Sequence, residues 1–298
     1  MSRTESARDA LKTRLSQDAP IADNPKTFGI IGSTDAHKAI PSTREENWFG
    51  KAYIVEPSPH RRDGVLIKSL VDPELSIMDI DLGASGLAAV WAKENTREAI
   101  WDAFNRREVF ATTGSRIRVR VFGGWDFEEE EVSRADFARE GYERGVPMGS
   151  DLRPGPEGTA PGFMVRALRD PDGANLDRVQ IVKGWLDANG ETHEKIWDVA
   201  CAGRETVNGS CDDDVGNTVD VEDASWTNTI GDALLGGYWE DPEFDPASRA
   251  FYYVRVLEIP TPRWTSYDAK AFDIEMPEGT PMTVQDRAYT SPIWYTPG

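Results

Sequence analysis

Hydrophobic positions change their spacing along the chain, and the change predicts two kinds of structure. Within residues 5–17, Ala7, Leu11 and Leu15 lie four positions apart, which predicts an amphipathic helix. Residues 28–32, Phe-Gly-Ile-Ile-Gly, form a short apolar run between glycines. Such a run is typical of a buried strand.

Two further helices are predicted before residue 114. Residues 85–93 are rich in alanine and predict a short helix. A second helix is predicted after Asn95, because asparagine is a good N-cap and Glu98 follows three residues later, as in a capping box. Its expected buried face consists of Ala99, Ile100, Ala103 and Phe104.

Beyond Gly114 the hydrophobic period becomes two. Ile117, Val119 and Val121 alternate with arginines, which predicts a half-buried strand with a cationic face. Several antiparallel strands separated by turn residues predict a β-sandwich over residues 115–298, with a boundary near Gly114. The later strands are expected at 162–168, 178–186, 194–200, 251–258 and 291–295.

Composition excludes some classes of partner. The chain has 298 residues, 39% of them hydrophobic, so it can form a packed core. Its formal net charge of -19 argues against nucleic acid as a partner, because the phosphate backbone attracts basic proteins. No apolar run approaches the ~20 residues of a membrane span, so membrane insertion is not expected. The N-terminus has no apolar stretch typical of a signal peptide.

The first candidate functional residues directly follow the predicted strand at 28–32. Asp35 and His37 are two residues apart, and we expect both side chains to reach one metal ion at the end of that strand. Zn²⁺, Mn²⁺ and Fe²⁺ accept mixed carboxylate and imidazole ligands. Because a catalytic zinc site usually has three protein ligands, this chain alone is expected to hold the ion weakly. Alternatively, Asp35 caps a turn and His37 is an ordinary surface histidine.

Other polar residues are candidates for supporting roles. A loop that follows the motif is expected either to complete and orient the metal site or simply to be solvated; it carries Glu45, Glu46 and Asn47. A phosphate or sulfate ester needs hydrogen-bond donors, among which arginine offers a bidentate fork. The candidate anion-binding residues are Arg97, Thr112, Thr113 and Arg116, with a helix-surface position as the alternative for Arg97.

Two cysteines and one histidine belong to polar turns. Cys201 and Cys211 flank a loop that could fold back as a hairpin, so they form either a disulfide, typical of an oxidising compartment, or two separate thiols. His193 lies in an apparent hairpin turn, where a structural role is predicted.

Longer strings resemble known families. Residues 32–37, Gly-Ser-Thr-Asp-Ala-His, resemble the last metal-binding motif of the PHP (polymerase and histidinol phosphatase) superfamily. Nearly the whole chain resembles the DUF3604 family, through the strings at 45–51, 84–92, 95–100, 111–117, 178–185 and 289–295. The resemblance implies an α+β protein in which residues 1–114 are the C-terminal part of a PHP-like (β/α) barrel and residues 115–298 are a mostly antiparallel β-sandwich.

The same resemblance implies a function. The implied function is metal-dependent hydrolysis of a phosphate or related small-molecule ester, with Asp35 and His37 as metal ligands. The chain lacks the His-x-His motif of the family's N-terminal half, so it looks like the C-terminal half of a member. The alternative is a catalytically silent β-sandwich binding module with a barrel remnant.

An incomplete barrel would have two further consequences. It would leave an exposed strand edge, through which we expect self-association. The parent family is expected in the periplasm or outside the cell, whereas this chain itself indicates no location.

Overall fold

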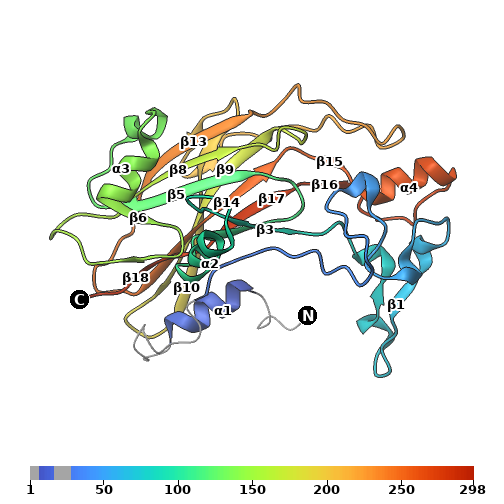
Figure 1. Cartoon of the computed structure of the whole chain (residues 1–298), viewed down its shortest axis with the longest axis horizontal. Coiled ribbons are helices and arrows are strands. Elements are labelled where there is room, and N and C mark those ends of the chain that lie inside the picture. The colour runs from blue at the N-terminus through green and yellow to red at the C-terminus, as the bar shows by residue number, and fades with distance from the viewer. Residues whose placement is uncertain (1–6, 17–27) are drawn as a thin grey trace.

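Two mainly antiparallel sheets form most of the molecule (Figure 1). The structure is a computed structural model that describes residues 7–16 and 28–298. The larger sheet has the strand order β10-β9-β14-β17-β4-β3, and β18 pairs with β14 and, in parallel, with the short β7. Its strands are β3 (Leu87–Val90), β4 (Val109–Thr112), β7 (Asp151–Leu152), β9 (Leu176–Leu186), β10 (Thr192–Cys201), β14 (Ala250–Glu258), β17 (Arg287–Thr290) and β18 (Ile293–Tyr295).

The smaller sheet packs on one face of the larger. Its order is β13-β8-β5-β6, and its strands are β5 (Arg118–Gly124), β6 (Gly145–Pro147), β8 (Gly162–Leu168) and β13 (Leu234–Glu240). Three two-stranded pairs complete the sheets: β1 (Val65–Ile67) with β2 (Ile77–Met78), β11 (Thr206–Val207) with β12 (Ser210–Cys211), and β15 (Thr261–Pro262) with β16 (Thr283–Val284).

Helices are short among the described residues. The α-helices are α1 (Ala7–Leu15), α2 (Arg97–Asn105), α3 (Phe137–Arg144) and α4 (Trp264–Phe272). Single 3₁₀ turns occur at Glu45–Asn47, Tyr53–Val55, Arg61–Asp63, Pro73–Leu75, Asp79–Asp81 and Glu129–Ser133. None of the helices in this part of the chain is long and apolar enough to cross a membrane.

The period-two pattern after Gly114 correctly predicts the sandwich. Ile117, Val119 and Val121 are buried in the main core, while Arg118 is exposed. Because successive side chains of a strand point to opposite faces, this alternation puts the apolar side against the larger sheet. The five later strands that the sequence predicts are present as β8, β9, β10, β14 and β18.

Strand β14 is buried on both faces. Tyr252 and Val254 belong to the core between the sheets, whereas Phe251 and Tyr253 point to the outer face of the larger sheet. There α1 packs with its buried Leu11 and Leu15, as the four-residue spacing predicts (Figure 1). The helix therefore shields a strand that would otherwise expose large aromatic side chains.

The expected PHP-like (β/α) barrel is wrong, because the structure is mostly antiparallel sheet with four short α-helices and the described residues form no closed barrel. In a (β/α) barrel each helix joins parallel strands. Here α2 joins β3 to β4, which are antiparallel. Strands on both sides of the boundary predicted at Gly114 share the larger sheet, since β4 pairs with β17.

Two local predictions before Gly114 are also wrong. Residues 85–93 form strand β3 rather than a helix, because pairing with β4 outweighs the helix propensity of alanine. Residues 28–32 form no strand but run extended along the edge of β3. The Gly32 N–H donates to the Leu87 carbonyl at 3.2 Å, and the Gly86 N–H donates to the Ser33 carbonyl at 3.0 Å. Gly32 permits this approach, since a Cβ there would lie 2.5 Å from the Leu87 carbonyl oxygen of β3.

Helix α2 is confirmed with a different start and a different packing. Thr96, not Asn95, is its N-cap, because the Thr96 hydroxyl accepts a hydrogen bond from the Ala99 N–H at 3.3 Å. Ala103 is the buried residue of the helix, while Phe104 remains 39% exposed. The helix therefore lies on the surface and contributes little to the core.

A small lobe, defined here as residues 43–84 and 261–284, lies at one end of the sandwich and contains β1 and α4 (Figure 1). Its core is formed by Trp48, Val55 and Trp264. The buried Arg61 guanidinium donates to the Asp268 carboxylate, with Nη2 2.6 Å from Oδ1, and also lies 4.2 Å from the Trp264 ring centre. This ion pair joins two segments that are far apart in the sequence.

Candidate functional site

The predicted metal ligands Asp35 and His37 lie together on the surface. Asp35 Oδ1 is 3.8 Å from His37 Nδ1, and both side chains are more than 60% exposed. The Lys51 ammonium donates to the other carboxylate oxygen, and this hydrogen bond lowers the pKa of Asp35. Among the described residues no third histidine, cysteine or carboxylate converges on the pair. Lys51 thus supplies the positive charge next to Asp35, and metal ligation stays a prediction.

Glu45 is hydrogen-bonded to other parts of the chain, and an orienting role at the metal site stays a prediction. Its carboxylate accepts hydrogen bonds from the backbone N–H of Ala84 and of Trp264, both at 2.7 Å. Burial raises the pKa of Glu45 above its usual value. Glu45 therefore connects the segment before β3 to the N-terminus of α4. Of its neighbours, Glu46 lies 3.5 Å from Arg44, and Asn47 is exposed.

The candidate anion-binding residues lie in different surroundings, and anion binding by them stays a prediction. Arg97 is exposed on α2, and Thr112 is buried in β4. The Thr113 hydroxyl donates to the Asp286 carboxylate at 2.6 Å. Arg116 donates to Asp170 through two nitrogens at 3.1 Å and to Asp172 at 2.5 Å. Two carboxylates therefore neutralise the arginine that was expected to hold an ester.

Several of these residues nevertheless surround one pocket between the sandwich and the small lobe. The pocket has a cavity volume of about 70 Å³ and opens to solvent, so it is smaller than the ~300–1,000 Å³ typical of sites for drug-sized ligands and fits only a small molecule. Gly114 allows the lobe to approach, because a Cβ there would overlap the Thr43 carbonyl oxygen. The lining consists of Thr43, Arg44, Glu45, Glu46, Ser115, Asp170, Asp172, Gly173, Ala174, Trp226, Glu258, Thr261, Pro262, Tyr267 and Asp286.

Glu258 is a strongly perturbed group of this pocket. It is 1% exposed, and burial raises its pKa to about 8, with Asp286 and Asp170 adding to the effect. The Ser115 hydroxyl donates to its Oε1. A carboxylic acid in this state holds its proton at neutral pH and can donate a hydrogen bond.

The two neighbouring carboxyl groups differ from each other. Burial raises the pKa of Asp286, and Thr113 only partly offsets it. Burial would also raise the pKa of Asp170, but hydrogen bonds from Arg116 outweigh it and the pKa is lowered. The pocket therefore contains the protonated Glu258 together with the ionised Asp170. Tyr267 adds a phenol whose pKa burial raises to about 12.

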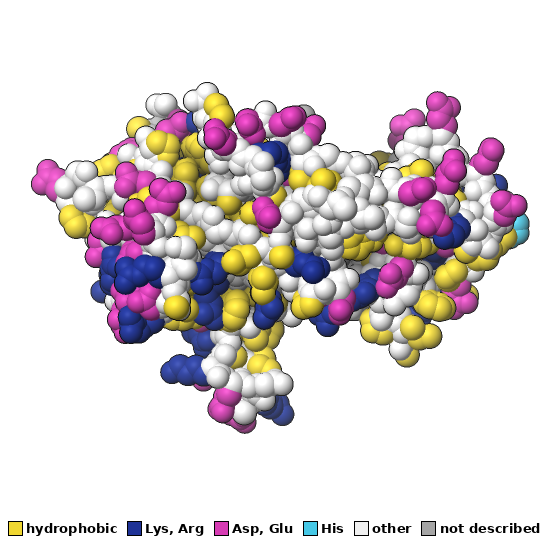
Figure 2. All heavy atoms as spheres, turned by 90° about the horizontal axis from the view of Figure 1, so that it is seen from above, with side chains coloured by type: hydrophobic (Ala, Val, Ile, Leu, Met, Phe, Trp, Pro, Cys, Tyr) yellow, Lys and Arg dark blue, Asp and Glu magenta, His cyan; other side chains and the backbone are white. Residues whose placement is uncertain are grey.

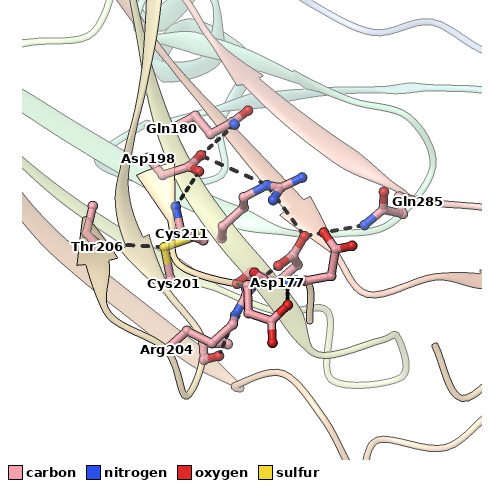
Figure 3. The surroundings of a disulfide bond; sticks show 12 residues. Asp177, Gln180, Asp198, Cys201, Arg204, Thr206, Cys211 and Gln285 are labelled. Atoms are coloured by element: carbon pink, nitrogen blue, oxygen red, sulfur yellow. Dashed lines mark hydrogen bonds and ion pairs between the residues drawn. A yellow bond between two sulfur atoms is a disulfide. The ribbon is translucent and has the colours of Figure 1, made fainter. Parts of the chain in front are cut away.

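The cysteines lie in a polar network next to this pocket (Figure 3). Cys201 and Cys211 form a disulfide with a sulfur separation of 2.08 Å and a Cα separation of 5.8 Å. Within the loop that they close, Arg204 donates to the Asp177 carboxylate. Gln285 donates to the same carboxylate at 3.4 Å and to the Glu258 carbonyl at 3.0 Å. The network thus ends at the backbone of the pocket's central acid.

Sequence reasoning missed Ser115, Asp170, Glu258 and Asp286 as a group. They belong to segments far apart in the chain, and only the sheet order brings them together. One feature could have indicated Glu258. It directly follows residues 250–257, which are apolar or aromatic except for Arg255, and burying a carboxylate at the end of such a strand is costly.

In a comparison with protein families, the chain matches the model described as "Protein of unknown function (DUF3604)" over residues 1–297. The chain belongs to the DUF3604 family. No curated protein and no solved structure gives a significant match. The family is therefore shown, while membership of the PHP superfamily is not. Figure 2 shows acidic side chains on the surface of both the sandwich and the lobe of this DUF3604 chain, as its net charge requires.

Proposed function

We propose that this DUF3604 chain is a binding module whose pocket between the sandwich and the small lobe takes a small organic cation, an amine or a guanidinium. One observation carries the proposal: Glu258 is buried at 1% exposure beside two other carboxyl groups, Asp170 and Asp286, in a pocket open to solvent. A cation that donates N–H groups to them would favour their ionised forms. Binding would then release a proton near neutral pH.

The remaining lining supports recognition rather than catalysis. Trp226 and Tyr267 provide aromatic surface, which attracts cations through the ring quadrupole. The buried hydroxyl of Ser115 donates to Glu258, an arrangement that fixes the acid rather than activating the serine. The described residues of the lining include neither histidine nor cysteine. The arrangement therefore favours the binding-module hypothesis.

Calorimetric titration of the full chain tests the proposal. The probes are agmatine and putrescine, with the uncharged 1,4-butanediol as the matched control. We expect the two cations to bind and to release protons, which is measured by repeating the titration in buffers of different ionisation enthalpy. The diol should not bind, because it carries no charge for the carboxylates.

Variants identify the pocket. Glu258→Gln and Asp286→Asn should each weaken binding of the cations by about tenfold, since each removes one charge partner. Glu157→Gln is the control, because Glu157 is an exposed acid outside this lining. Equal binding by wild type and Glu258→Gln, or absence of binding to wild type, would contradict the proposal.

Metal-dependent hydrolysis of a phosphate or related ester is a second candidate. It is favoured by the exposure of Asp35 and His37, whose side chains approach to 3.8 Å and are accessible to Zn²⁺, Mn²⁺ or Fe²⁺. The ion would have to displace Lys51 from Asp35. Hydrolysis of p-nitrophenyl phosphate with added Mn²⁺, lost in His37→Ala, would support this function. Equal rates in both proteins would rule out His37 as a ligand.

A further inference from the structure

The turn between β9 and β10 gathers three metal-ligating side chains. One ligand atom from each of Asp187, Glu191 and His193 lies within 4.8 Å of the other two. The turn itself is closely hydrogen-bonded: the Asp187 N–H donates to the Glu191 carbonyl at 2.9 Å, and the Gly190 N–H donates to the Asp187 carbonyl at 3.0 Å. Gly190 has φ +81°, a conformation that glycine adopts without strain.

Asp187 is held in place by the turn. Its Oδ1 accepts hydrogen bonds from the backbone N–H of Asn189 at 2.9 Å and of Glu191 at 2.8 Å. The other oxygen, Oδ2, is thereby directed at His193 Nε2, at 2.9 Å. One carboxylate oxygen therefore accepts the backbone hydrogen bonds, and the second faces the imidazole, where a metal ion could bind both groups.

His193 is held by the neighbouring strand. It is directly opposite Trp185 in the β9–β10 ladder, and the two rings stack with centres 5.3 Å apart and an angle of 22°. Two of the three side chains are therefore preorganised. Glu191 is exposed in the turn and can move toward them at little cost.

We infer that Asp187, Glu191 and His193 form a binding site for a divalent transition metal of the Zn²⁺ class. Mixed carboxylate and imidazole ligands suit such ions. Two ligands of one tetrahedral Zn²⁺ lie roughly 3.4 Å apart, given Zn–N and Zn–O bonds of about 2.1 Å. The 2.9 Å between Asp187 and His193 needs only a small opening to reach this value. The ion would replace the proton that the two groups now share.

The site would keep coordination positions for another ligand. Three protein ligands leave at least one position open, as in catalytic rather than structural zinc sites. Asp187 and Trp185 also line a pocket together with Glu243, Ser248 and Tyr252. An ion held by Asp187 therefore lies at the edge of a cavity. The other described cluster of three, Asp198 with Cys201 and Cys211, has its sulfurs in the disulfide.

The inference is tested by titrating the full chain with Zn²⁺ after treatment with a chelator. An excess of Mg²⁺ is present, because it occupies the weak carboxylate sites of an acidic surface. The chain has three histidines, so their ring signals in an NMR spectrum are simple to assign by substitution. We expect the signals of His193 to shift on binding of a single Zn²⁺, while those of His60 do not.

Variants separate this site from the rest of the surface. His193→Ala should abolish the binding, and Glu191→Gln should weaken it by about tenfold or more, with the turn intact because no backbone group depends on that side chain. Asp187→Asn keeps an oxygen for the turn N–H groups and should also weaken the binding.

Two controls decide the outcome. His60→Ala and Glu157→Gln should bind Zn²⁺ as the wild type does, because neither residue belongs to the cluster. Loss of binding in His37→Ala with retention in His193→Ala would overturn the inference in favour of the Asp35 site. Unchanged binding in every variant, or no binding at all, would also overturn it.

Discussion

Glu258 and Asp170 are both buried carboxylic acids at the same pocket, yet their pKa values move in opposite directions. Asp170 receives two hydrogen bonds from the Arg116 side chain and one from its backbone N–H, and the pKa falls. Glu258 accepts a hydrogen bond from the Ser115 hydroxyl but has no cationic partner within residues 7–16 and 28–298, and burial raises its pKa to about 8. The difference between the two lies in the Arg116 guanidinium and the two backbone N–H donors that Asp170 has, which residue type and local sequence do not reveal.

Glu258 should make the stability of the protein depend on pH. The unfolded chain releases this proton near the ordinary value of 4.5, whereas the folded chain holds it to about 8. Its stabilising contribution is therefore fully present below about pH 4.5 and is lost as the pH rises toward 8. We expect Glu258→Gln to flatten the decrease in the free energy of unfolding between about pH 5 and 8, measured by urea denaturation.

The control for this measurement is Glu157→Gln, an exposed acid, which should follow the wild-type pH profile. Glutamine retains an oxygen that accepts the Ser115 hydroxyl, so the comparison changes the ionisation and little else. Parallel profiles for wild type and Glu258→Gln would show that Glu258 titrates at an ordinary pKa in the folded protein.

At the scale of elements, β5 shows a pattern that local sequence specifies well. Val119 is completely buried in the core between the sheets, and Arg118 beside it is exposed. The period of two fixes which face turns inward. Strand β3 is the opposite case, since its alanines favour a helix and only the pairing with β4 makes it a strand.

Adjacent substitutions in β5 should therefore have very different effects. Val119→Asp should lower the free energy of unfolding by about 4 kcal/mol or more, because it removes apolar burial worth about 1.5–3 kcal/mol and puts a carboxylate in the core. Arg118→Asp should change it by less than about 1 kcal/mol, as is usual at an exposed position. Denaturation curves compare the two, and equal effects would mean that the strand faces are assigned wrongly.

At the scale of the whole molecule, the sheet order joins the two parts of the chain. Strand β4, which precedes Gly114, lies between β3 and β17, and its Phe110 is 3% exposed in the main core. The predicted boundary near Gly114 is therefore crossed by backbone hydrogen bonds and by packing. We expect the described chain to unfold as one cooperative unit.

Phe110→Ala tests this expectation. It should lower the free energy of unfolding of the entire chain by about 3–5 kcal/mol, as is typical for removing a buried phenylalanine. Tryptophan fluorescence and far-ultraviolet circular dichroism should report one coincident transition for both proteins. Two transitions, with Phe110→Ala shifting only one of them, would instead support separate domains divided near Gly114.

The sequence by itself determined the family, the helix α1, the position of α2 and five of the strands that follow β5. These features depend on local period and on long matching strings, so they need no knowledge of the partners. It also located Glu45, Glu46, Thr113 and Arg116 as polar residues of interest, and these lie at or beside one pocket.

The tertiary structure decided the chemistry of that pocket and the architecture around it. The sequence predicted donors for an anion, but Asp170 and Asp172 neutralise Arg116, and Glu258 and Asp286 make the pocket acidic. The prediction of a barrel is wrong for a similar reason, because the antiparallel pairing of the strands was not visible in the local sequence. Pairing and charge compensation both depend on residues that are distant in the chain, and single-sequence periodicity contains no information on which distant segments meet.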